Sequence, residues 1–410
     1  MREDLKFVAV GHVDHGKSTM IGRLLYDTNS LPPDKMEEVR RMSDESDGMP
    51  EFAFVTDYLE EERKNRVTID TAQIFFRTAQ REYVIIDAPG HKQFLKNMIT
   101  GSTLAEAALL LVAAEEGLQE QTHRHGYILS LLGIKQLLVV VNKMDLVDYR
   151  REKFEQIKKD ITARLNEFGL KPLMVIPIGA KSGENVARRS EKMSWYEGLT
   201  LLEGLDRLQP APLKDKGPLR FPVQDVYEQE GEKILVGKIA SGTIQSGQEV
   251  MIHPLGKSAV VDYIKVLEGR REQAEAGRSI GVVLKEKSAM QGLKRGQIIC
   301  NKTPSPRISN TVTGTVFWMN GEPLRKNEKI YLQCATQKVM CKVKKIRERL
   351  NSSTLEILEE DAEQLHETEV GKLTLQAEQS VCMDPFEEVE GMGRFVLIRD
   401  TDTVAGGVVH

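Results

Sequence analysis

The chain has 410 residues, of which 40% are hydrophobic and 29% charged, a balance typical of a globular protein with room for about two to four domains. The net charge of -4 argues against a broad electrostatic attraction to nucleic acid, although a local basic patch is compatible with it. No apolar run approaches the roughly 18 residues of a membrane span, and the first residues lack the apolar core of a secretory signal. We therefore expect a cytoplasmic protein without a membrane partner.

The first half of the chain, from Leu5 to about Leu208, alternates short apolar runs with segments of helical periodicity. This alternation is typical of strand-helix-strand units around a mostly parallel sheet with helices on both faces. Most of the apolar runs lead into polar or glycine-bearing loops, and ligands of such sheets bind where the strands end. The expected buried strands are Phe7–Val10, Tyr83–Ile86, Leu109–Val112, Leu137–Val141 and Met174–Pro177.

A phosphate-binding loop follows the first expected strand. The run from Gly11 to Ser18, GHVDHGKS, fits the pattern Gly-x4-Gly-Lys-Ser, and a helical pattern begins at Thr19. Backbone N–H groups and the helix N-terminus would face the phosphates, Lys17 would reach the β- and γ-phosphates, and the Ser18 hydroxyl would bind Mg²⁺. A plain strand-to-helix turn is the alternative, and the place of the motif between a strand and a helix argues against it.

The next two features concern the γ-phosphate. The polar stretch from Asn29 to Arg66 has few apolar positions, as expected of a mobile segment that the γ-phosphate orders. Asp87 then ends the strand Tyr83–Ile86 and starts the run DAPGH. We expect the Asp87 carboxylate to hold a Mg²⁺-bound water and Gly90 to offer its N–H group to the γ-phosphate.

A third motif indicates the base. Asn142-Lys143-Met144-Asp145 ends the strand Leu137–Val141. An ionised carboxylate only accepts hydrogen bonds, so Asp145 suits guanine, whose N1–H and amino groups both donate, and rejects adenine. Residues Gly179-Ala180-Lys181 would close over the guanine O6 through a backbone N–H group. The three motifs together predict GTP and GDP as ligands and GTP hydrolysis as the activity.

The sequence changes character after Leu208. A proline-rich, charged stretch from Gln209 to Pro218 predicts a linker, and short β-type runs broken by glycine, such as Ile234–Ile239, predict a barrel. A second break at Thr303–Pro306 precedes another β-rich stretch. We expect a GTP-binding domain over residues 1–208 and β-barrel domains over 209–303 and 304–410. Four widely spaced cysteines, without a Cys-x-x-Cys pair, predict reduced and buried thiols: Cys300, Cys334, Cys341 and Cys382.

These motifs, in this order, resemble those of the translation-factor GTPases related to elongation factor Tu, which carry GHVDHGKST and DAPGH. The resemblance covers essentially the whole chain and implies a P-loop GTPase domain followed by two β-barrels. It implies that His91 orients the attacking water and that Thr68 completes the Mg²⁺ shell. It also implies that Val13 and Val67 form an apolar gate between that histidine and the γ-phosphate.

The resemblance and the motifs together give a set of site residues. The implied catalytic residues are Lys17, Thr68 and His91, and the implied metal ligands are Ser18, Thr68 and Asp87. The residues expected to bind the nucleotide are Gly11, His12, Val13, Asp14, His15, Gly16, Lys17, Ser18, Thr19, Asp87, Gly90, Asn142, Lys143, Asp145, Gly179, Ala180 and Lys181.

Within that superfamily the chain is most similar to the GTPase large subunit, subunit 1, of the bacterial two-subunit sulfate adenylyltransferase. That subunit couples GTP hydrolysis to the synthesis of adenosine 5′-phosphosulfate from ATP and sulfate on an ATP-binding small subunit. This chain lacks the Ser-Gly-Gly-x-Asp-Ser loop with which the small subunit binds ATP, so we do not expect it to make the product alone. The similar stretches are Asn142 to Tyr149, Glu191 to Leu208, which contains Trp195 and Tyr196 and is the most specific, Gly217 to Val226, Val316 to Leu324 and Gly393 to Val409.

Three departures from that family leave alternatives open. His12 and His15 match elongation factors, Arg66 replaces a usual glycine, and Gly179 replaces a frequent serine. A second hypothesis is an elongation-factor-like GTPase that delivers aminoacyl-tRNA, for which the Lys/Arg-dense run Lys338 to Arg349 is the one basic stretch in the barrels. A third is a GTPase of this type that serves another partner enzyme. Arg66 could act as an arginine finger, although a solvated cation is the simpler interpretation.

Overall fold

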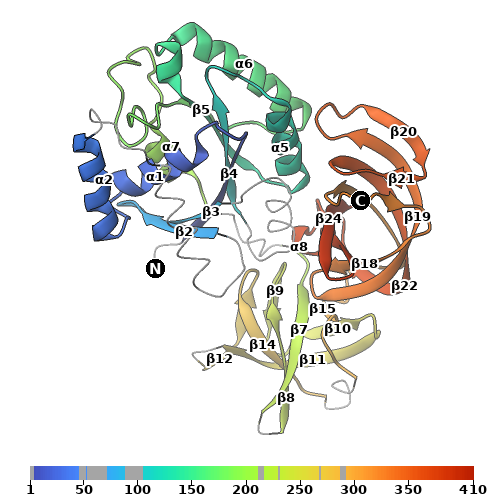
Figure 1. Cartoon of the computed structure of the whole chain (residues 1–410). Coiled ribbons are helices and arrows are strands. Elements are labelled where there is room, and N and C mark those ends of the chain that lie inside the picture. Colours follow the sequence, from blue (N-terminus) through green and yellow to red (C-terminus); the bar gives the residue numbers. More distant parts are fainter. Residues whose placement is uncertain are drawn as a thin grey trace. The chain divides into compact units, whose positions relative to one another are not determined.

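The computed structural model describes residues 4–45, 52, 72–87, 105–210, 217–229, 231–266, 269–286 and 292–410, with the side chains of 40–45, 72 and 87 left out. The chain divides into two compact units (Figure 1). The first lies within Met1–Ala211, and Pro212–His410 makes up nearly all of the second. None of the helices in these ranges is long and apolar enough to cross a membrane.

The first unit is built on a six-stranded sheet with the order β2-β3-β1-β4-β5-β6. All five predicted strands are present and parallel to one another, and β2 is added antiparallel to β3 at one edge. Every residue of β4 is buried, as expected of a parallel strand covered on both faces. The strands are β1 (Leu5–Gly11), β2 (Ala72–Arg77), β3 (Glu82–Asp87), β4 (Ala107–Ala113), β5 (Gln136–Asn142) and β6 (Met174–Pro177).

Helices cover this sheet because their apolar residues recur every three or four positions. Helix α6 buries Phe154, Ile157, Ile161 and Leu165. Helix α7 starts at a capping box, in which Thr200 and Glu203 exchange side-chain-to-backbone hydrogen bonds of 2.8 and 3.2 Å. The helices are α1 (Lys17–Asp27), α2 (Pro33–Glu45), α5 (Glu120–Leu131), the 3-10 turn η1 (Met144–Val147), α6 (Arg151–Glu167) and α7 (Leu201–Arg207).

Helix α2 corrects one expectation. We expected the polar stretch from Asn29 to Arg66 to be mobile, yet its first part forms α2. Met36 and Val39, three positions apart, pack against the apolar core and give the helix one buried face. Phe52 is also fully buried in that core. The rest of the stretch after Glu45 lies outside the described residues.

The second unit contains two closed β-barrels, which confirms the predicted fold class. In the first, the sheet runs β10-β15-β7-β8-β14-β11-β12 and closes through β10 and β11. Its interior is filled by apolar side chains such as Phe221, Leu235, Ile252 and Val282. The strands are β7 (Arg220–Gln229), β8 (Glu232–Lys238), β9 (Thr243–Gln245), β10 (Glu249–His253), β11 (Lys257–Val266), β12 (Gly269–Arg271), β13 (Gln273–Glu275), β14 (Ser279–Leu284) and β15 (Ile298–Cys300).

The second barrel runs β18-β23-β24-β16-β22-β19-β20 and closes through β18 and β19. Trp318, Leu332, Val343 and Leu397 are among the fully buried residues of its core. The exact domain boundaries stay predictions. The elements are β16 (Arg307–Trp318), β17 (Leu324–Arg325), β18 (Lys329–Cys334), β19 (Gln337–Asn351), β20 (Ile357–Ala362), β21 (Gln364–Leu365), β22 (Glu369–Met383), α8 (Glu390–Gly393), β23 (Arg394–Arg399) and β24 (Asp402–Val409).

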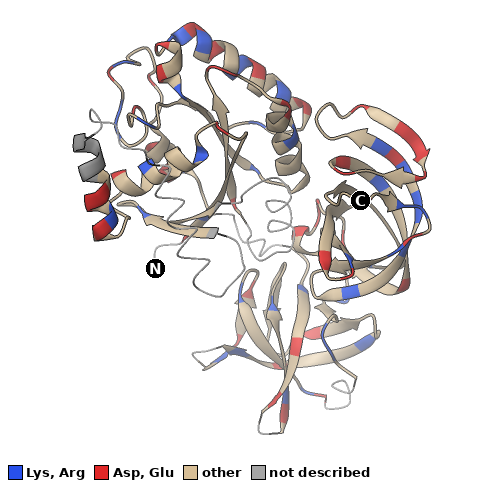
Figure 2. Ribbon diagram, viewed as in Figure 1, with Lys and Arg blue, Asp and Glu red and all other residues tan. Residues whose placement is uncertain are grey.

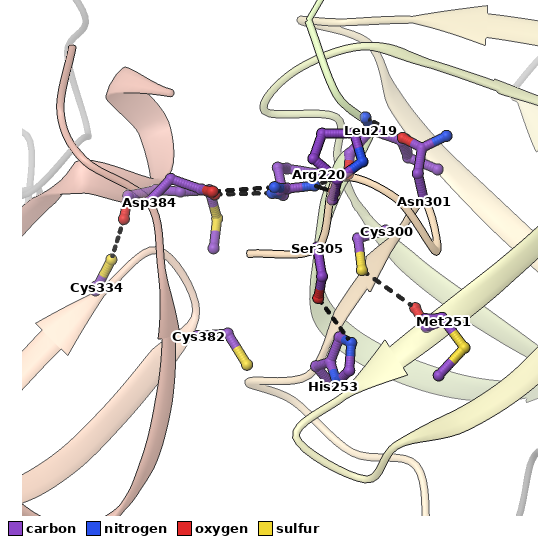
Figure 3. A network of polar contacts seen from close by, with 12 residues as sticks. Leu219, Arg220, Met251, His253, Cys300, Asn301, Ser305, Cys334, Cys382 and Asp384 are labelled. Carbon is purple, nitrogen blue, oxygen red and sulfur yellow. Dashed lines mark hydrogen bonds and ion pairs between the residues drawn. The ribbon is translucent and has the colours of Figure 1, made fainter. Parts of the chain in front are cut away.

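A buried ion pair joins the two barrels (Figure 3). The guanidinium of Arg220, in β7, donates hydrogen bonds of 2.8 and 3.0 Å to the two carboxylate oxygens of Asp384, which follows β22. The side chains are only 1% and 4% exposed. Arg220 also donates to the carbonyls of Leu219 and Pro304, so its charge is well satisfied inside the protein.

All four cysteines are free and buried, as predicted. Three of them, Cys300, Cys334 and Cys382, lie around this ion pair (Figure 3). Burial raises the pKa of Cys300 to about 11 and that of Cys334 and Cys382 to about 12. They are therefore protonated, unreactive thiols at neutral pH.

Candidate nucleotide-binding site

The predicted nucleotide loops meet at the carboxyl edge of the parallel sheet. Strands β1, β3 and β5 end at Gly11, Asp87 and Asn142, three of the predicted site residues. The register pairs Ala9 with Asp87, so the Asp87 backbone stands beside the end of β1, where the phosphate loop begins. Loops far apart in the sequence thus come together because parallel strands end at one edge.

The backbone of the phosphate loop adopts, at Gly16, a conformation that glycine favours. Gly16 has a φ of 85°, and a Cβ atom there would lie 2.4 Å from the Asn142 side-chain nitrogen. No other residue fits both the conformation and the space. Lys17, Ser18 and Thr19 form the first turn of α1, and the N–H groups and dipole at a helix N-terminus favour an anion.

Asn142 holds the phosphate loop and the base loop together. Its side-chain nitrogen donates to the His15 carbonyl at 2.9 Å, and its side-chain oxygen accepts from the Ala180 N–H at 3.0 Å. Asn142 is only 2% exposed, so these bonds are shielded from water. In this structure Asn142 therefore fixes the phosphate loop and the base loop relative to each other.

The two histidines of the phosphate loop point into the protein. The ring Nδ1 of His15 lies 3.2 Å from the Leu111 carbonyl, and its Nε2 lies 3.5 Å from the Glu116 carboxylate. Burial outweighs that carboxylate and lowers the pKa of His15, so the ring is neutral at pH 7. His12 packs edge-on against His15 and contacts the Gln121 side chain. Both rings brace the loop, and within it the His15 N–H donates to the His12 carbonyl at 3.2 Å.

The base loop presents a carboxylate without a protein partner. Lys143 has a φ of 60° and starts η1, which carries Asp145. Asp145 is half-buried, and within the described ranges its carboxylate has no hydrogen bond or ion pair. The Lys143 ammonium contacts Glu115 at 3.1 Å. Asp145 is thus left to accept hydrogen bonds from a ligand, which is what guanine recognition requires.

The structure limits which N–H group of Gly179-Ala180-Lys181 could bind the guanine O6. Within Gly179-Ala180-Lys181, the Gly179 N–H donates to the Glu184 carbonyl at 3.0 Å and the Ala180 N–H to Asn142. The Lys181 N–H has no acceptor among the described residues. The predicted hydrogen bond to the guanine O6 therefore falls to Lys181, or to Ala180 if its N–H is shared.

Other predicted site residues are placed only in part. Val13 is 67% exposed and Asp14 is also exposed, so both lie on the open side of the loop. For Asp87 the structure gives the backbone alone. Thr68, Gly90 and His91, together with Arg66 and Val67, lie outside the described residues.

The oxygen donors present fit Mg²⁺. A serine hydroxyl and a carboxylate, those of Ser18 and Asp87, are the hard oxygen ligands that this ion prefers, and Mg²⁺ commonly takes further ligands from phosphates and water. Within the described ranges no group of three or more His, Cys, Asp or Glu side chains could hold a metal by itself. The ion would thus bind together with the nucleotide.

Sequence reasoning missed the residues that support the site. Glu115 and Glu116 follow β4, and Gln121 lies in the first turn of α5; they contact Lys143, His15 and His12. The sequence contained a signal for them, because Glu115 and Glu116 come shortly after the apolar run of β4. A charged pair at that place indicates another loop at the same edge of the sheet.

Comparisons with known proteins show the family of the chain. The family described as "Elongation factor Tu GTP binding domain" matches residues 3–211, and "GTP-eEF1A C-terminal domain-like" matches residues 311–410. Elongation factor 1-alpha of Pyrococcus furiosus is 37% identical over 99% of this chain and 97% of its own. Sulfate adenylyltransferase subunit 1 is 34% identical over 99% of this chain in both Aliarcobacter butzleri and Aeromonas salmonicida, covering 87% and 86% of those relatives. The chain therefore belongs to the translation-factor GTPases that share the elongation factor Tu GTP-binding domain.

Proposed function

We propose that this GTPase is the large subunit of a sulfate-activating enzyme. It would couple GTP hydrolysis to the synthesis of adenosine 5′-phosphosulfate from ATP and sulfate on an ATP-binding small subunit. Relatives with the name sulfate adenylyltransferase subunit 1 match along the whole chain, as elongation factors do. The choice between them rests on the part of the first unit where the resemblance to the sulfate-activating family is most specific.

The observation that carries the proposal is the packing of two of those stretches against each other. The indole N–H of Trp195 donates to the Tyr149 carbonyl at 2.9 Å. The Phe154 ring lies 5.4 Å from Trp195 and 5.9 Å from Tyr196, between centroids. The stretches Asn142 to Tyr149 and Glu191 to Leu208 thus contact each other through a hydrogen bond, and Trp195 and Tyr196 form an aromatic cluster with Phe154 of α6.

The cluster lines an open groove of ≈ 610 Å³ between α6 and β6. Trp195 and Tyr196 are half-buried there, and Leu173 on the same wall is 51% exposed. The groove lies away from the nucleotide loops in sequence and holds none of the predicted site residues. The stretch Glu191 to Leu208 therefore contributes Trp195 and Tyr196 to a surface groove that contains none of the predicted nucleotide residues.

The chemistry at the nucleotide follows from the chain's own residues. Lys17 and the N–H groups at the start of α1 would neutralise phosphate charge, and Asp145 would fix the guanine. Mg²⁺, held by Ser18 and Asp87, would supply further charge at the β- and γ-phosphates. His91 would orient the attacking water, a role that rests on the family resemblance. A second catalytic site for sulfate is not expected on this chain, so the energy would be used on a bound partner.

A reconstitution tests the proposal. Mixing the chain with an ATP-binding small subunit should raise the GTPase rate and make ATP- and sulfate-dependent pyrophosphate release require GTP. In Asp145→Asn the requirement should pass from GTP to xanthosine triphosphate, because the asparagine donates to the carbonyl that replaces the guanine amino group. Pyrophosphate release that ignores both nucleotides would contradict the proposal.

A second candidate, delivery of aminoacyl-tRNA, is favoured by one surface. Strand β19 is rich in lysine and arginine (Figure 2). A register shift after Val343 leaves both Lys344 and Lys345 exposed, and neither has an ion pair within the described residues. The adjacent strand β20 carries Glu359, Glu360 and Asp361, which lowers the net positive charge of this surface. GTP-dependent protection of the ester bond of an aminoacyl-tRNA, with no response to the small subunit, would favour this candidate.

A further inference from the structure

Arg23 contacts more of the nucleotide domain than its position in α1 suggests. Its guanidinium makes two bonds of 2.9 Å to the Asp27 carboxylate, one turn later in the helix. The guanidinium carbon also lies 5.2 Å from the centre of the Phe52 ring and 5.6 Å from that of Tyr26. The Arg23 side chain is 20% exposed. It is therefore held by a carboxylate while it packs on two aromatic rings.

Phe52 lies between α2 and β2 in the sequence and packs in the core of the first unit. Its side chain is fully buried, and its ring lies 5.5 Å from that of Tyr26. Its carbonyl oxygen is 2.4 Å from the place where a Cβ on Gly22 would stand, so only glycine at position 22 allows this approach. Phe52 belongs to the stretch that we expect to respond to the γ-phosphate. It packs against α1, the helix that begins at the predicted phosphate loop.

The same guanidinium packs against the base loop. A Cβ placed on Gly183 would lie 2.5 Å from the guanidinium carbon and from one of its nitrogens. Gly183, with a φ of 81°, donates its N–H to the Gly179 carbonyl at 2.8 Å and thereby closes the turn that carries Ala180. Arg23 therefore touches the turn whose N–H groups are expected to meet the guanine.

We propose that Arg23 is a positioning residue that couples the turn Gly179–Glu184 to Phe52, so that nucleotide release depends on how Phe52 is packed. The simpler interpretation is a surface Arg-Asp pair that stabilises α1 alone, which would be worth little. Contacts with both Phe52 and the base turn distinguish Arg23 from such a pair. Because coupling is reciprocal, whatever fixes Phe52 also tightens the turn around the base. The inference requires only GTP and GDP binding and is independent of the partner.

The test is the dissociation rate of GDP and of a non-hydrolysable GTP analogue, each labelled on the ribose. Arg23→Ala should release both about tenfold faster, the equivalent of about 1.4 kcal/mol for a partly desolvated cation-aromatic contact. Phe52→Leu should act in the same direction although Phe52 is not part of the turn. The double variant should release nucleotide no faster than the stronger single variant, because both act through one contact. Arg23→Lys keeps the charge without the planar group and should not restore the rate.

Arg164 provides a matched control. Its guanidinium carbon lies 5.1 Å from the Phe168 ring, it pairs with Glu167, and it also donates to His123 Nδ1 at 2.7 Å. It thus combines an ion pair and a cation-aromatic contact on α6, whose residues belong to none of the nucleotide loops. Arg164→Ala should leave nucleotide release unchanged. Release within about twofold of wild type in Arg23→Ala, an equal effect of Arg164→Ala, or additive effects of Arg23→Ala and Phe52→Leu would each overturn the proposal. If Arg23→Ala does not fold, unchanged release in both Arg23→Lys and Phe52→Leu would overturn it.

Discussion

Asn142 should be the residue whose loss most directly separates the two nucleotide loops. Asn142→Ala removes the donor to the His15 carbonyl and the acceptor for the Ala180 N–H, at 2.9 and 3.0 Å. Each buried backbone group left without a partner costs about 1–3 kcal/mol. The shortened side chain leaves space in which water can satisfy one of them, so we expect a total of about 1–3 kcal/mol.

The substitution should lower both the stability of the chain and its affinity for GDP. The free energy of unfolding falls, and GDP affinity falls about 10- to 100-fold, because the phosphate and base loops are no longer fixed at their bound spacing. Urea unfolding and GDP titration of the same variant measure the two effects.

A second buried amide controls for loss of stability alone. Gln337 exchanges two hydrogen bonds with the Cys382 backbone in the second barrel, at 2.7 and 2.9 Å. Gln337→Ala should destabilise the chain to a similar degree with unchanged GDP affinity. If Asn142→Ala binds GDP as tightly as wild type while Gln337→Ala loses stability, the link between the loops has no role in binding.

Four further outcomes are expected. Asp145→Asn should weaken GTP binding and favour xanthosine triphosphate in a titration, and equal GTP affinity in wild type and variant would remove Asp145 from base recognition. His91→Ala should lower kcat about 100-fold with nucleotide affinity little changed, and a wild-type rate would exclude His91 from the mechanism. Asp384→Asn should lower the free energy of unfolding by about 3–5 kcal/mol, because a buried guanidinium loses its counter-charge, whereas replacing Arg220 and Asp384 together by Met and Leu should cost much less. Burial lowers the pKa of His15 below 6.5, so its stability contribution is present above about pH 6.5 and is lost as the pH falls towards the folded-state pKa; His15→Gln should flatten that part of the pH dependence of Tm.

The parallel strands of the first unit could be predicted because each one is marked by its own local sequence. All five parallel strands of the first unit are continuous apolar runs, and such runs have few other structures open to them. Helix α2 was missed because, among its described side chains, Met36 and Val39 are the apolar residues that pack on the core. A polar helix of this kind is stabilised by the core against which these residues pack. The Arg220–Asp384 pair could not be predicted, because nothing local connects residues that lie 164 positions apart.

The site could be predicted as a set of loops, but its internal contacts could not. Motif spacing gave Lys17, Asn142 and Asp145, since phosphate and base chemistry restrict the residue types at those positions. The bracing contacts of His15 and the packing of Arg23 on Gly183 depend on side-chain directions across the sheet edge. Those directions are a tertiary property that periodicity does not contain.

The packing of His15 and Gly179 makes these two departures from the sulfate-activating family weaker arguments against membership in it. His15 faces Leu111 and Glu116, so the histidine at this position braces the loop from the interior of the protein. Gly179 is similar, because a Cβ there would lie 2.9 Å from the Ser182 hydroxyl, and the local turn favours glycine.

Both differences are therefore adjustments within a GTP site that elongation factors and sulfate-activating subunits have in common. Such a site cannot identify the partner, since both classes must bind and hydrolyse the same nucleotide. The discriminating residues have to lie on surfaces that the nucleotide does not touch. In the first unit the Trp195 and Tyr196 groove is such a surface, whereas in the second barrel it is the lysine-rich strand β19.

Trp195→Ala should therefore weaken activation by the small subunit and leave basal GTP hydrolysis unchanged, whereas Lys344→Glu with Lys345→Glu should affect only binding to RNA. Loss of basal hydrolysis in Trp195→Ala would place the aromatic cluster in the shared machinery and remove the observation that favours the sulfate-activating role.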